Sequence, residues 1–321
     1  MRVTKCLSVA VPLVLLLMLS GTLYALADVP RVDFTQEPGK VVVEMGGQPV
    51  ATYIYADKAI TRPYFAHVRA PGGIQVTRNH PPIEGKDSTD HATMHPGLWM
   101  AFGDISGADY WRNKDKVVTK EFVEKPTGGP GKGTFAVRNV YLAKGEAETI
   151  NCTEVCRYTI FVRPSGYLFI WNSTFSADQG KFFFGDQEEM GLGVRMASPI
   201  TEKTGGIILN ADGIRGAKQA WGKAANWCDY SGAIDGKHVG ITLMCDPANF
   251  RPSWFHVRDY GLLLANPFGR KSFTKGEPSK VVVKPGETFR LRYGVLLHTS
   301  PTGGHPDLKA AYADFLQLIG E

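Results

Sequence analysis

The sequence lacks several features that would place it in a known functional class. No segment after the N-terminal leader approaches the roughly 20 apolar residues of a membrane-spanning helix. The two segments richest in candidate site residues contain no GxSxG elbow, no phosphate-binding glycine loop and no Rossmann fingerprint. The formal charge of +5 is mild, and no basic cluster is interleaved with aromatics. These absences argue against a membrane transporter, a nucleotide-binding enzyme, an α/β-hydrolase and a nucleic-acid partner.

The N-terminus has the pattern of an export signal. Arg2 and Lys5 precede an apolar run over residues 7–19, and Ala25-Leu26-Ala27 matches a signal peptidase site. We therefore expect residues 1–27 to be a signal peptide and 28–321 to form one domain of a secreted or periplasmic protein. A retained anchor is the alternative.

Cysteine is scarce, with four residues left after the expected cleavage. Export permits their oxidation. Cys228 and Cys245 flank a turn-rich run centred near Gly236, which predicts a disulfide across a hairpin, and Cys152 and Cys156 would then close a small loop. The alternative is that some stay as buried free thiols.

Alternating apolar and polar residues dominate the rest of the chain. They predict strands over residues 41–44, 51–55, 116–123, 134–142, 158–162, 167–175 and 287–298. The convincing helix comes last, with Pro306 in its first turn and Leu308, Tyr312, Phe315 and Ile319 at helical spacing. Many strands and almost no helices predict an all-β fold, a large antiparallel β-sandwich with a C-terminal helix.

The segment from Asp90 to Trp111 is the richest in site chemistry, because it mixes histidines, aspartates and tryptophans with turn-forming Gly and Pro. Arg78, His80, His91 and His95 fall within 18 positions. We interpret these histidines as groups that contact or protonate a ligand. A metal pair at His91 and His95, and histidines that merely rigidify loops, are the alternatives; Pro96 disfavours the helical geometry that a metal pair would use.

Two later segments add charged groups. Glu188 and Glu189 precede a strand, where neighbours point to opposite faces, so at most one lines a given pocket, and Arg195 is a candidate ion partner. In a second strand Trp254, His256 and Arg258 would share one face, followed by Asn266. Such a face suits an anion or sugar hydroxyls. The alternative for Glu188 and Glu189 is that they are only charged residues at the start of a strand. The alternative for the second strand is that it is partly buried and that Arg258 forms a structural ion pair.

At these residues the sequence resembles a known family. The runs RPYFAHV, PGGIQVTRNHPP, DHATMHPGLWMAFGDISGADYW, EEMGLGVR and WFHVRDYGLLLANPFG together resemble the bacterial PmoA-like proteins, which carry the label methane oxygenase. Ala92, Thr93 and Met94 replace part of the family's Asp-His-Pro-His-His arrangement, which argues against a three-histidine metal site here. The resemblance implies a supersandwich similar to galactose mutarotase and aldose epimerases. The label itself does not fit, since a membrane monooxygenase subunit needs several spanning helices.

A groove lined by imidazole, guanidinium, tryptophan and carboxylate suits a sugar, so we predict a carbohydrate-active protein, an enzyme of the glycoside hydrolase or epimerase type, that acts on a carbohydrate or other small polar substrate. The predicted catalytic residues are His91, His95, Glu188, Glu189 and His256. The predicted substrate-binding residues are Arg78, His80, Trp99, Trp254, Arg258 and Asn266. We expect the Asp90 and Trp254 segments to form opposite walls of one pocket, without a cofactor. A non-catalytic carbohydrate-binding module and a histidine-ligated, metal-dependent oxidoreductase are the alternatives.

Overall fold

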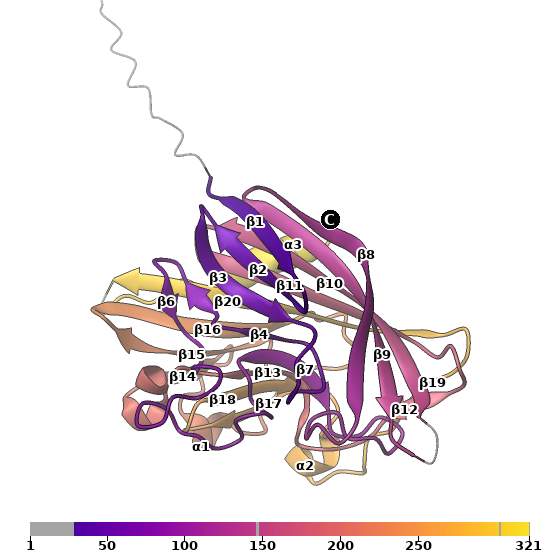
Figure 1. Ribbon diagram of the computed structural model, residues 1–321. Helices are drawn as coiled ribbons and strands as arrows, with labels where there is room; N and C mark the ends of the chain where they lie inside the picture. The colour runs from indigo at the N-terminus through magenta and orange to yellow at the C-terminus, as the bar shows by residue number, and fades with distance from the viewer. Residues whose placement is uncertain (1–28, 146–147, 302, 321) are drawn as a thin grey trace, which may run out of the picture.

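The computed structural model describes residues 29–145, 148–301 and 303–320, so the expected signal peptide over 1–27 lies outside the described residues (Figure 1). The strands are β1 (Arg31–Glu37), β2 (Lys40–Met45), β3 (Gln48–Ile54), β4 (Tyr64–Ala66), β5 (Arg69–Ala70), β6 (Ile74–Gln75), β7 (Leu98–Phe102), β8 (Lys116–Pro130), β9 (Lys132–Ala143), β10 (Thr149–Arg163), β11 (Gly166–Ser176), β12 (Phe182–Phe184), β13 (Met190–Arg195), β14 (Ile207–Asn210), β15 (Trp227–Ile234), β16 (Lys237–Cys245), β17 (Trp254–Arg258), β18 (Leu262–Asn266), β19 (Val281–Val283) and β20 (Thr288–Pro301). The helices are η1 (Ser198–Ile200), η2 (Glu202–Thr204), α1 (Ala217–Ala220), α2 (Arg270–Thr274) and α3 (Leu308–Gly320).

Sixteen strands form one continuous antiparallel sheet, in the order β14-β15-β16-β20-β11-β10-β9-β8-β1-β2-β3-β4-β7-β13-β18-β17. The sheet folds over on itself, so that its two halves pack face to face around one core. Tyr53 on β3 lies 5.1 Å from Tyr158 on β10, and Phe65 on β4 lies 5.8 Å from Phe169 on β11, measured between ring centroids. The predicted all-β sandwich is confirmed, and its two layers are parts of the same sheet.

Period-two burial produces these layers. In β2, Val41, Val43 and Met45 are buried while the residues between them are partly exposed. The predicted C-terminal helix is also confirmed as α3, which buries Leu308, Ala311 and Phe315 against the back of the sheet. Gly294 of β20 makes room for it, since a Cβ there would lie 2.9 Å from the Phe315 ring.

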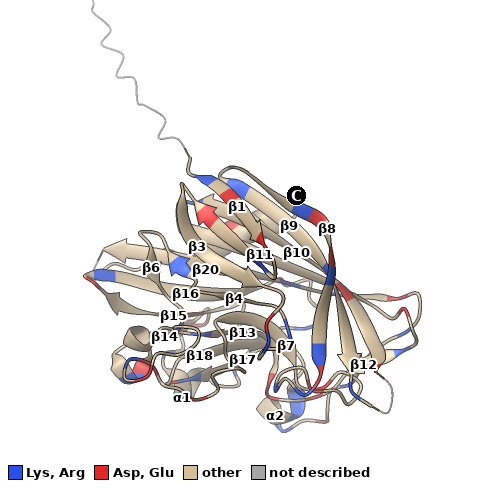
Figure 2. Ribbon diagram, viewed as in Figure 1, with Lys and Arg blue, Asp and Glu red and all other residues tan. Residues whose placement is uncertain are grey.

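Both signs of charge are interspersed along the long strands β8 to β10 (Figure 2). The ion pair of Arg138 with Glu121 links β9 to its neighbour β8, and that of Arg157 with Glu124 links β10 to β8 across β9. Among the described residues, no helix is both long and apolar enough to cross a bilayer.

The predicted disulfide between Cys228 and Cys245 is wrong, because both thiols are free and buried. The β15–β16 hairpin pairs Cys228 with Leu243, which leaves Cys245 two residues beyond the partner position. Diagonal neighbours at that offset lie about 7–8 Å apart, whereas disulfide-linked Cα atoms usually lie within about 7 Å. The turn is centred one position earlier than its composition indicates, and this small difference separates the thiols.

The predicted pairing of Cys152 with Cys156 is wrong for a different reason. Both lie on the same strand, β10, with their side chains in the core. An extended strand separates residues four apart by about 13 Å. A small loop, which the pairing needed, does not form here.

Native protein should therefore resist thiol alkylation, and burial, which raises the pKa of the Cys156 and Cys228 thiols, further reduces their reactivity. Unfolding in guanidinium without any reductant should then expose all four thiols of residues 28–321, read as four alkyl additions by mass spectrometry. Fewer additions, restored to four by reductant, would show that a disulfide exists.

Candidate functional site

Four adjacent strands, β7, β13, β18 and β17, carry five of the eleven predicted site residues, and the others lie on loops that flank these strands. Alternate residues of each strand enter the main core, and the others point away from it. We call the second set the outer face; it consists of Trp99, Ala101, Gly191, Gly193, Arg195, Trp254, His256, Arg258, Leu262, Leu264 and Asn266. The register aligns Trp99, Gly193, Leu264 and His256 in one row across the strands. Residues far apart in sequence thus share one surface.

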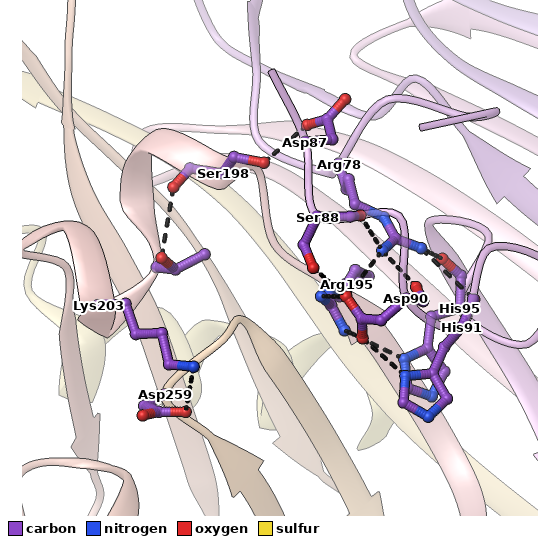
Figure 3. Close-up of polar contacts among 11 residues, drawn as sticks. Arg78, Asp87, Ser88, Asp90, His91, His95, Arg195, Ser198, Lys203 and Asp259 are labelled. Carbon is purple, nitrogen blue, oxygen red and sulfur yellow. Dashed lines mark hydrogen bonds and ion pairs between the residues drawn. The ribbon is translucent and has the colours of Figure 1, made fainter. Parts of the chain in front are cut away.

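At one end of the outer face, two buried arginines hold a single carboxylate (Figure 3). Arg195 donates from both terminal nitrogens to the Asp90 carboxylate, at 2.7 and 3.0 Å. Arg78 donates to the backbone carbonyls of Ser88, Asp90 and His95 and so fixes the loop that carries Asp90. Burial by itself would raise the pKa of Asp90, but hydrogen bonds from Arg195, Ser88 and His91 outweigh it and hold that pKa well below its usual value. Asp90 is therefore a fixed anion at neutral pH.

His91 is attached to this anion. Its Nδ1 lies 2.6 Å from Asp90 Oδ2, and its side chain is 40% exposed. A carboxylate at Nδ1 selects the tautomer that carries its proton there, which leaves a lone pair on Nε2. His91 is in this way an oriented, accessible imidazole.

His95 is chemically different although it lies close by. Its ring stacks between His91 at 4.8 Å and Trp99 at 5.1 Å, measured between ring centroids, and is 3% exposed. Gly193 lets Trp99 lie flat on the sheet, since a Cβ there would come within 3.0 Å of the indole. Burial, followed by the charge of Arg195, lowers the pKa of His95 to about 2. His95 is therefore neutral and is not a proton donor at neutral pH.

His80 lies behind this cluster, where its ring packs edge-on against Tyr64 at 5.1 Å. Burial lowers its pKa to about 4, against the opposing effect of Asp57. Asp57 also accepts a hydrogen bond from the Tyr64 hydroxyl at 2.8 Å. This geometry makes His80 a neutral packing group near the site.

A second polar cluster lies on β17, across β18 from Arg195, since Arg195 and Arg258 both pair with Leu262. Arg258 Nε donates to His256 Nε2 at 2.9 Å, while His256 Nδ1 lies 3.2 Å from the Glu188 carbonyl. A neutral His256 with its proton on Nδ1 satisfies both contacts. Burial lowers its pKa, consistent with this state. His256 thereby positions Arg258, whose guanidinium also lies 3.3 Å from the Glu188 carboxylate.

The remaining predicted residues have structural partners. Glu189 pairs with Arg112, whereas Asn266 donates to the backbone carbonyls of Gln187 and Glu188 and holds that loop on the sheet. Trp254 packs against Phe273 of α2.

Two neighbouring cavities open at this part of the molecule. The first, of about 230 Å³, is lined by Arg78, Ser88, Arg195, Met196, Ser198, Thr201, Lys203, Thr204 and Tyr260. The second, of about 440 Å³, is lined by Glu202, Ala217, Lys218, Trp221, Val257, Arg258 and Asp259. We call them the arginine cavity and the tryptophan cavity. Of the residues predicted to face one pocket, Arg258 lines the tryptophan cavity, and His91, His95 and His256 line neither cavity.

A short wall separates the two cavities. It consists of η2 and the loop at Asp259, joined by a hydrogen bond from the Lys203 amide to the Asp259 carbonyl at 3.1 Å. Lys203 lines the arginine cavity, and its neighbour Glu202 lines the tryptophan cavity. Adjacent residues of this wall therefore face different cavities.

Comparison with known proteins identifies the family of this chain. Residues 40–310 match a family model described as "Family of unknown function (DUF6807)". The chain belongs to this family. The description does not mention PmoA-like proteins, so that resemblance stays a prediction from sequence. No curated protein matches this DUF6807 member.

Two solved structures align loosely with the chain. A putative kojibiose phosphorylase from human microbiome aligns with 8% identity and a TM-score of 0.36, over 90% of this DUF6807 chain and 35% of its own. This chain thus spans about a third of that protein. A galactose mutarotase-like protein from Lactobacillus casei ATCC 334 aligns with 10% identity and a TM-score of 0.35, over 83% of this chain and 100% of its own. Scores this low do not establish a shared fold.

Sequence reasoning assigned the partner of Arg195 to Glu188 or Glu189, and the structure corrects this, because Arg195 holds Asp90 instead. Tyr260, which packs 4.5 Å from the Arg195 guanidinium, and Lys203 were also missed. Within the described parts of this DUF6807 chain, no three His, Cys, Asp or Glu side chains converge as metal ligands would.

Proposed function

We propose that this protein is an exported, carbohydrate-active protein that binds a saccharide across the arginine and tryptophan cavities and transfers a proton through His91. The observation that carries the proposal is the Asp90–His91 pair, in which a clamped carboxylate orients an accessible imidazole. The cavities beside it combine aromatic rings with charged side chains, the combination that binds the two kinds of surface on a sugar.

The chemistry assigned to His91 is that of a general base and acid. With its proton on Nδ1 held by Asp90, Nε2 takes a proton from a sugar hydroxyl or an activated C–H group. The imidazolium that forms is stabilised by the Asp90 anion, since the two atoms are already 2.6 Å apart. His95, with a pKa of about 2, supports the His91 ring by stacking rather than by titrating.

Binding is assigned to groups on both sides of the wall. In the tryptophan cavity, the Arg258 guanidinium lies 5.8 Å from the Trp221 ring centroid, so a sugar there meets an aromatic surface and a hydrogen-bond donor together. Arg258 is kept in place by His256 and Glu188. In the arginine cavity, the hydroxyl groups of the lining residues offer polar contacts.

Replacing His91 with Asn is expected to lower kcat by about 10²-fold or more, with saccharide affinity nearly unchanged, because Nε2 is lost while both cavities remain. Asn also tolerates the left-handed backbone at this position, where φ is 50°. The measurement is turnover of a panel of glycosides and free sugars, followed by NMR for hydrolysis, epimerisation and anomer exchange.

His67→Asn is the matched control, since His67 is another exposed loop histidine with φ of 54° and is not among the side chains that contact Asp90. It should retain full activity. Saccharide binding without turnover in the unmodified protein would reject the catalytic role and leave a binding module. A panel in which no saccharide binds would reject the carbohydrate proposal.

A further inference from the structure

The arginine cavity has an unusual balance of charge. Its walls include the cationic side chains of Arg78, Arg195 and Lys203, and no carboxylate is among the described residues that line it. The side chains of Arg78 and Arg195 are 2% and 1% exposed, so both positive charges are buried and fixed in position, unlike charges on flexible surface side chains. A ligand entering this cavity meets concentrated positive charge.

The nearest carboxylate does not neutralise both arginines. Asp90 is engaged at both of its oxygens by Arg195, and its Oδ1 lies 3.7 Å from Arg78. The hydrogen bonds of Arg78 go to backbone carbonyls, which carry no net charge. Burial, followed by repulsion from Arg195, lowers the pKa of Arg78 to about 10, so it stays charged at neutral pH. Asp90 is therefore the carboxylate that both buried cations contact, and Asp87 adds a weaker attraction to Arg78.

Both arginines also retain unused donors. The Nε atoms of Arg78 and Arg195 are buried and have no hydrogen-bond partner among the described residues. Buried polar groups in folded proteins nearly always have partners, so these N–H groups indicate an acceptor from outside the chain. An oxyanion supplies both the charge and the acceptor atoms.

The hydroxyl groups of the cavity indicate the rest of the ligand. Ser88 donates to Asp90, Ser198 donates to Asp87, and Thr204 donates to the Ser198 carbonyl. Their protons are committed to the protein, so their oxygens are left to accept hydrogen bonds. Sugar hydroxyls are suitable donors.

We propose that the substrate is an anionic saccharide whose acidic group, the carboxylate of a uronic acid or a sulfate ester, lies in the arginine cavity. This inference rests on the proposed function and adds the substrate class. Lys203 completes the anion site from the rim. It is 60% exposed and lies 3.8 Å from Asp259, a weak surface pair that leaves its ammonium free to turn to a ligand.

The test compares sugars that differ only at C6. Galactose, galacturonate and galactose 6-sulfate, with the matching gluco and manno series, are titrated into the full mature protein and followed by ligand-observed NMR. The acidic members of at least one series should bind about tenfold or more tightly than the neutral sugar, and this preference should shrink with added salt. The carboxylate and sulfate arms show which oxyanion is preferred.

Variants at the rim separate this site from general attraction to charge. Lys203→Gln should weaken binding of the acidic sugar about fivefold and leave the neutral sugar unchanged, and Lys203→Glu should weaken it further. Lys120→Gln, at an exposed lysine on β8 far along the sheet from the cavity, should have no effect. Circular dichroism confirms that each exposed-site variant stays folded.

Neutral sugars that bind as tightly as their acidic counterparts would overturn this inference and leave the proposed function standing. Equal effects of Lys203→Gln and Lys120→Gln would overturn it too, because the preference would then come from overall charge. If no sugar of either kind binds, the proposed function fails and this inference fails with it.

Discussion

Lowering the pH below about 6.5 is expected to reduce the free energy of unfolding by about 1.4 kcal/mol per pH unit through His95 alone. Burial and the charge of Arg195 lower the pKa of this imidazole to about 2 in the folded chain. In the unfolded chain it titrates near 6.5, so between these values the unfolded state binds one more proton. Stability contributed by neutral His95 is therefore complete above pH 6.5 and falls steadily as the solution is acidified.

Urea unfolding at pH 7, 6, 5 and 4 measures this slope. His95→Gln removes the titrating group while retaining a polar side chain, so the variant should show a shallower decline even where its absolute stability is lower. His80, whose pKa burial lowers to about 4, contributes in the same direction and remains in both proteins. Equal slopes in the two proteins would contradict the assignment.

Removing the Asp90 charge is expected to cost about 3 kcal/mol, the largest effect of any single substitution at the site. Asp90→Asn removes the carboxylate that the buried guanidinium groups of Arg78 and Arg195 both contact. We place the cost at the lower end of the range for broken buried pairs, because Asp90 is 34% exposed and water compensates in part.

Asp33→Asn gives the comparison. Asp33 also pairs with an arginine, Arg31, but these side chains are 43% and 57% exposed, so the change should stay within about 0.5 kcal/mol. Both variants are measured by urea unfolding at neutral pH. Similar costs for the two substitutions would show that the Asp90 cluster is no more than a surface ion pair.

The local pattern of apolar and polar residues was enough to predict much of the fold. Alternation located β2, β9, β11 and β20, and the spacing of Leu308 and Phe315 located α3. The order of the strands was not predictable, because β20 inserts between β11 and β16 through pairings that no local pattern encodes. The disulfide prediction failed because it also depended on strand pairing. The β15–β16 hairpin turns one position earlier than predicted, so Cys228 pairs with Leu243 and not with Cys245.

At the candidate site, too, the sequence predicted some features and not others. Alternation correctly grouped Trp254, His256 and Arg258 on one side of β17, where Trp254 and His256 both meet Phe273. It could not show that Arg195 reaches a carboxylate 105 positions away in sequence. Nor could it separate His91 from His95, whose different chemistry arises from the indole of Trp99 covering only the second ring. These properties depend on which loop covers which strand.

The position of β20 has a consequence for how this chain reaches its folded state. In the part of the chain that the structure describes, β14 to β16 join the rest of the sheet only through β20, which lies between β16 and β11 although it is the last strand made. Until residue 301 has left the ribosome, the backbone hydrogen-bonding groups of β11 and β16 lack their shared neighbour. Unpaired strand edges readily recruit other chains. The emerging polypeptide must therefore be kept from self-association until nearly its whole length is available, and completion of the sheet becomes a late, all-or-none event.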